Sequence, residues 1–226
     1  MPKYGIDQDA LIQMMSQASA KQTEQLRQGI AQATLAALQG RELTLKNIRN
    51  VLKTVADSAA TGVAMNQFAP AEAERVLDQV VAGMDQAVLK AVEANQVALG
   101  QLVKQGADLR EKHLKKAITD LEHMGDSFVD AIRKAAEAAD AQAQAQWAPV
   151  LDKLQMKGTL SGAQASTAAQ EFMDQMQAAA RESRASSLKA VQALSESYVA
   201  LVSGVLIGMS DAFTSGAPAA AKKTKR

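Results

Sequence analysis

Apolar residues recur at spacings of three and four along most of this chain, which is the period of an α-helix with one apolar face. Gly and Pro residues divide the pattern into long segments. The expected helices begin near residue 7 or 9, near 41 or 44, at 70, near 108 and between 161 and 167, and they end near 40, 66, 105, 146 and 216. Residues 150–156 are expected to add two helical turns. No stretch alternates with a period of two, so we expect no β-strands. The pattern predicts an all-α fold of four or five long amphipathic helices, arranged as an elongated antiparallel bundle or as coiled-coil hairpins.

Two segments carry a heptad seam, in which apolar positions alternate at intervals of four and three. The first seam comprises Leu77, Val81, Met84, Val88, Ala91, Asn95, Ala98 and Leu102. The second seam comprises Leu114, Ile118, Leu121, Gly125, Phe128, Ile132, Ala135 and Ala139. We favour a turn at residues 106–108, between the seams, although one continuous helix over residues 70–147 stays open. Asn95 would set the register if the first seam paired two chains.

Two further signals concern helix ends. Trp147 and Pro149 lie close together, and Pro149 predicts a kink or a helix end because it lacks a backbone N–H. Trp147 beside this break is interpreted as a local packing plug. Residues 157–162 are the clearest loop in the chain.

The most distinctive segment is an uncharged apolar run at residues 198–209, bounded by Glu196 and Asp211. It is shorter than the roughly 20 residues that a membrane-spanning helix needs, so we expect no transmembrane span. It is apolar on all sides, whereas a surface helix needs only one apolar stripe. Gly204 and Gly208 form a small-residue ridge that permits the close approach of another helix.

Two interpretations of this apolar run remain open. In the first, the other helices cover it as the central strip of the bundle. In the second, which we favour, it stays partly exposed and inserts into an apolar surface or another subunit. The candidate residues for apolar-surface binding or self-association are Tyr198, Leu201, Val202, Gly204, Val205, Leu206, Ile207, Gly208 and Met209.

Composition narrows the class of protein. The 226 residues carry a net charge of +1, 3% aromatic residues and no Cys. The few aromatic anchors favour thin, extended helical packing, and the lack of Cys excludes disulfides and thiolate chemistry. The N-terminus has no apolar signal-peptide core, so we expect a cytoplasmic location, with granule association left open. We expect one helical domain over residues 1–216 and a disordered basic tail over residues 217–226.

No constellation of residues points to catalysis. The chain has neither a phosphate-binding Gly-x-x-x-x-Gly-Lys-Ser/Thr loop nor a Gly-x-Ser-x-Gly nucleophile motif. The two histidines, His113 and His123, fall on different helix faces, and only Asp120 shares a face with His123. We therefore expect no enzyme activity, no cofactor and no metal site. No specific nucleic-acid partner is expected beyond a weak contact of the basic tail.

In general character the chain resembles the phasins, small proteins that coat polyhydroxyalkanoate storage granules in bacteria. The resemblance rests on the length, the absence of Cys, the Ala- and Gln-rich amphipathic helices and the tail at residues 219–226. It implies a protein surfactant that lays apolar helix faces on the polymer and leaves charged faces in water. It implies no catalytic residues.

The alternative function is structural. A coiled-coil or helical-bundle protein would self-associate through its seams as a scaffold, without affinity for apolar surfaces. We expect the chain to form a homo-oligomer. In the phasin-like case we also expect it to bind an apolar polymer or lipid-like surface.

Overall fold

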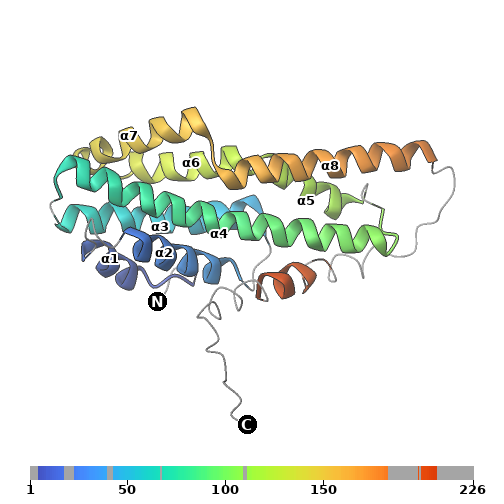
Figure 1. The fold of residues 1–226 in the computed structure, drawn as a ribbon, viewed down its shortest axis with the longest axis horizontal. Coiled ribbons are helices and arrows are strands. Elements are labelled where there is room, and N and C mark those ends of the chain that lie inside the picture. Colours follow the sequence, from blue (N-terminus) through green and yellow to red (C-terminus); the bar gives the residue numbers. More distant parts are fainter. Residues whose placement is uncertain are drawn as a thin grey trace, which may run out of the picture.

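The structure is a computed structural model, and it describes residues 5–17, 23–39, 43–66, 68–108, 111–182, 198 and 200–207. The fold is all-α, and no β-strand occurs within these ranges (Figure 1). The helices are α1 (Gln8–Ser16), α2 (Thr23–Leu38), α3 (Leu45–Asn66), α4 (Pro70–Lys104), α5 (Lys112–Glu122), α6 (Met124–Glu137), α7 (Ala141–Lys157) and α8 (Leu160–Glu182).

Helix α4 is the central helix of the described fold. It is 35 residues long and contacts α2, α3, α7 and α8. Helices α1 and α2 lie on one side of it, and α7 and α8 lie on the other (Figure 1). Helix α3 also contacts α1 and α6, and α8 rests on α5 and α6 as well as on α4. The buried side chains of these layers form one hydrophobic cluster.

Helices α7 and α8 run along α4 in the same direction as α4 itself. Lys153 of α7 pairs with Glu74 at 2.7 Å and with Asp78 at 2.6 Å, near the start of α4. Further along, Gln96 of α4 donates to Glu171 of α8 at 3.2 Å. The hydrogen bonds to Asp78 and Glu74 raise the pKa of Lys153 above its usual value. These contacts fix the register of the α7–α8 pair on α4.

Both predicted seams lie in the core. All eight residues of the first seam are buried along α4. Six residues of the second seam are buried on α5 and α6, and Gly125 and Ala139 are half-buried. The predicted turn between the seams is also confirmed, because α4 ends at Lys104 and Gly106 has a φ of 85°. Residues 70–147 therefore do not form one helix.

The predicted number of helices is wrong, because the described ranges hold the eight helices α1–α8, besides the helical residues 200–207, instead of four or five. In place of the first expected helix, α1 ends at Ser16 and α2 begins at Thr23. The fourth is broken at His123, between α5 and α6.

A kink or a helix end was predicted at Pro149, and the helix end does not occur. Pro149 lies within α7, which continues to Lys157. Helix α7 begins at Ala141, where the Asp140 carboxylate accepts a hydrogen bond from the Ala143 N–H at 2.9 Å. Trp147 is fully buried, as expected for a packing plug.

Helix α8 starts on a cap that α4 provides. The buried Asp85 carboxylate accepts hydrogen bonds from the backbone N–H groups of Leu160 and Ser161, both at 2.9 Å. The Thr159 hydroxyl accepts a third bond, from the Gly162 N–H at 3.0 Å. Free N–H groups at a helix start need such acceptors. The clear loop expected at residues 157–162 is therefore reduced to Gly158 and Thr159.

Asp85→Asn is expected to lower the free energy of unfolding by about 1–2 kcal/mol, because one amide oxygen cannot replace two charged acceptors. Urea denaturation followed by far-UV circular dichroism would measure the change. The control is Asp57→Asn, which removes a partly exposed partner of Lys53 and is expected to cost less than about 0.5 kcal/mol. Equal effects of the two substitutions would contradict the capping role of Asp85.

Candidate apolar binding segment

The described part of the apolar run is helical and packs against the rest of the described chain. Tyr198 and residues 200–207 are helical in the described ranges, and the run lies beside the second half of α4 (Figure 1). Val202 is 3% exposed and Leu206 is 1% exposed, and both belong to the hydrophobic core cluster. Gly208 and Met209 lie outside the described residues, as does the predicted tail at residues 217–226.

Hydrogen bonds with described residues of α4 and of the segment after α2 attach this helix to the body. The Tyr198 hydroxyl donates to Oδ1 of Asn95 on α4. The Gln39 side chain, just after α2, donates from Nε2 to the Leu206 carbonyl oxygen at 3.5 Å. Asn95 is 2% exposed, so this partner satisfies a polar group that the core otherwise surrounds. The Asn95 position on the seam therefore serves a contact within the chain.

The helix has an inner and an outer stripe. Tyr198, Val202 and Leu206 are four positions apart and define the inner stripe, against the body. Gly204 and Ile207 lie on the outer stripe, where Ile207 is 50% exposed. Among the residues that the structure describes, none has a heavy atom within 4 Å of the place that a Cβ on Gly204 would occupy. Leu201 and Val205 are half-buried between the stripes.

The pairing of Asn95 with Tyr198 was missed in the sequence, although each residue stood out there. A polar amide on an apolar seam needs a partner, and a Tyr in an otherwise apolar run carries a donor. The two residues are 103 positions apart, so no local spacing connects them.

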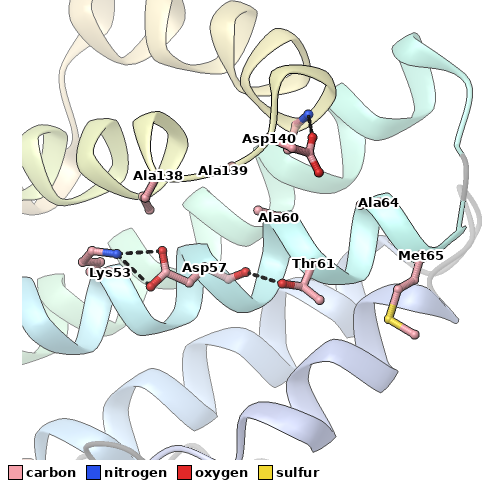
Figure 2. Close-up of a pocket in the computed structure, with 11 residues that line it drawn as sticks. Lys53, Asp57, Ala60, Thr61, Ala64, Met65, Ala138, Ala139 and Asp140 are labelled. Atoms are coloured by element: carbon pink, nitrogen blue, oxygen red, sulfur yellow. Dashed lines mark hydrogen bonds and ion pairs between the residues drawn. The ribbon is translucent and has the colours of Figure 1, made fainter.

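A groove of about 550 Å³ lies between α3, α6 and the start of α7 (Figure 2). Alanines line much of it. Its charged groups are already used, because Lys53 binds Asp57 at 2.9 Å and Asp140 caps α7. The Thr61 hydroxyl donates to the Asp57 carbonyl oxygen at 3.1 Å. The groove therefore presents no set of converging polar groups for a substrate.

A second groove, of about 720 Å³, lies between α6 and the joint of α7 and α8. Here Gly125 and Gly162 bring two backbones together, and Asp130 pairs with Arg133 at 3.2 Å. This groove also lacks a nucleophile next to a base.

The histidines do not form a metal site in the part of the chain that the structure describes. His113 and His123 are both exposed, and no group of three or more potential ligands is placed to bind a metal there. Within the same ranges, no helix has both the length and the hydropathy for crossing a bilayer.

Comparison with known proteins gives a family and no function. No curated protein and no solved structure matches the chain. Residues 1–215 match a family described as a family of unknown function (DUF6781). Because this match covers nearly the whole chain, the protein belongs to the DUF6781 family.

Proposed function

We propose that this chain is a non-enzymatic helical protein that coats an apolar surface, such as a cytoplasmic polyhydroxyalkanoate granule. In this proposal the helices form an elongated bundle in which α7 and α8 run parallel to α4, and the apolar run at residues 198–209 is the segment that contacts the surface. The observation that carries the proposal is the position of the run. Residues 200–207 are helical and lie at the edge of the body, with Ile207 half exposed.

The energetics favour such a contact. Burial of apolar surface yields about 25 cal/mol per Å², so even a few large apolar side chains contribute usefully to binding. An interfacial helix of this kind lies in the plane of the surface and does not span it.

The double substitution Val205→Asp and Ile207→Asp is expected to weaken binding to polyhydroxybutyrate particles by at least about tenfold, because it places two charges on the contact face. Cosedimentation of the protein with the particles measures the effect, and triolein droplets coated with phosphatidylcholine test whether the surface must be a polymer.

The matched control is Met156→Asp with Leu160→Asp. These residues are 77% and 72% exposed at the joint of α7 and α8, so the control also removes two apolar side chains and adds two negative charges. The control is expected to bind like the wild type. Unchanged binding of the Val205 and Ile207 variant would overturn the proposal, and circular dichroism of both variants would exclude unfolding as the cause.

One observation favours a second candidate function, self-association as a scaffold. Gly204 has open space around its Cβ position, as the close approach of a helix from another copy requires. The α4 seam is already buried within one chain, so the Gly204 ridge is the better candidate surface for pairing. A homo-oligomer that Gly204→Leu dissociates in sedimentation velocity, with no binding to particles, would support this function instead.

A further inference from the structure

The run holds its strongest apolar groups on the side that faces the body. Val202 and Leu206 are almost completely buried, whereas the described outer stripe offers one large side chain, Ile207. A docked run can therefore bury little apolar area on an external surface. If all large side chains of the run reached that surface, the buried area and the affinity would rise together.

The face that receives the run is partly polar. Asn95 contributes its amide oxygen to Tyr198, and Gln39 contributes its amide nitrogen to the Leu206 carbonyl oxygen. When the run leaves, water can solvate both amides, which lowers the cost of exposing this face. The run itself has no such compensation in water, because its inner stripe consists of Val202, Leu206 and the ring of Tyr198.

We propose that the inner stripe, residues 198, 202 and 206, binds either the body or the apolar polymer surface, so that the two contacts exclude each other. This inference rests on the proposed function and adds that the run must undock for tight binding. The docked helix then competes with the surface. The measured binding constant for particles therefore equals the intrinsic binding constant multiplied by the fraction of molecules whose run is undocked.

The first test changes the body and leaves the run intact. Asn95→Ala removes the acceptor of the Tyr198 hydroxyl, which weakens docking and is expected to strengthen binding to polyhydroxybutyrate particles by about tenfold. Asp85→Asn is the control, because it is also a polar substitution on α4 but contacts α8 instead of the run. It is expected to leave particle binding unchanged.

The second test locks the run in place. The chain has no Cys, so Gln39→Cys with Ser203→Cys creates two unique thiols that a cleavable bismaleimide can join. The cross-linked protein is expected to bind particles at least tenfold more weakly than the same protein after cleavage of the linker. This comparison uses one sequence and one preparation, so differences in folding do not enter.

The outcomes separate the two proposals. If cross-linked and cleaved proteins bind particles equally well, the run binds while docked and the exclusion is wrong, although surface binding stands. If Asn95→Ala and Asp85→Asn strengthen binding equally, general loosening of the body explains the gain and the exclusion is again wrong. If neither the wild type nor Asn95→Ala binds particles, the proposed function fails, and this inference fails with it.

Discussion

Trp147→Ala is expected to lower the free energy of unfolding by about 3–5 kcal/mol, the largest effect of any single substitution considered. Trp147 is completely buried on α7, which contacts α3, α4 and α6. Its removal leaves a cavity that the surrounding helices can fill only in part. Urea denaturation followed by circular dichroism at 222 nm would measure the loss, because the chain has no second Trp to report by fluorescence.

Trp147→Phe serves as the control for this prediction. No described protein group accepts a hydrogen bond from the indole Nε1, so the ring contributes chiefly through its volume. The Phe variant keeps most of that volume and is expected to cost about 1–1.5 kcal/mol. A similar loss in both variants would show that the shape of the site, and not cavity size, sets the stability.

Gly83→Ala is the second large effect, with an expected loss of about 2 kcal/mol. At Gly83 a Cβ would lie 2.6 Å from the Arg27 carbonyl oxygen and 2.9 Å from the Ile30 Cβ. Backbone atoms of α2 cannot move aside cheaply, so α2 and α4 would have to separate. The relevant measurement is again the free energy of unfolding in urea.

Gly100→Ala is the matched control, since it is the same substitution on the same helix. No heavy atom lies within 4 Å of the Cβ position there. Ala forms helix better than Gly, so this variant is expected to be more stable than the wild type by about 0.5–1 kcal/mol. Changes of opposite sign in the free energy of unfolding of the two variants would show that helix packing, and not helix propensity, requires Gly83. Stabilisation in both variants would contradict the close contact.

The helical pattern predicted the core better than it predicted the helix boundaries. The seam from Leu77 to Leu102 is buried at every position, because a period of three and four determines which face meets the other helices. The break at His123 leaves that pattern unchanged, so the spacing of apolar residues carried no sign of it. Pro149 shows the converse: of the kink or helix end that it predicted, the end does not occur, because α7 continues past this residue.

The candidate segment could be recognised in the sequence, but its orientation could not. Its composition alone distinguishes the run at residues 198–209 from the rest of the chain. Which of its sides faces inward depends on a hydrogen bond to Asn95 and on the packing of Val202 and Leu206. These are contacts across a large separation in sequence, and a pattern that is apolar on all sides does not distinguish one side from another.

The cap that Asp85 supplies to α8 has a consequence for cooperativity. The first turn of α8 has a local cap in Thr159, but two of its N–H groups depend on the Asp85 carboxylate, about 75 positions earlier in the chain. Local opening of α4 near Asp85 therefore removes two of the three acceptors at the start of α8. Amide protons at the start of α8 then exchange with solvent through the same opening event as the middle of α4, which joins the two helices into one cooperative unit.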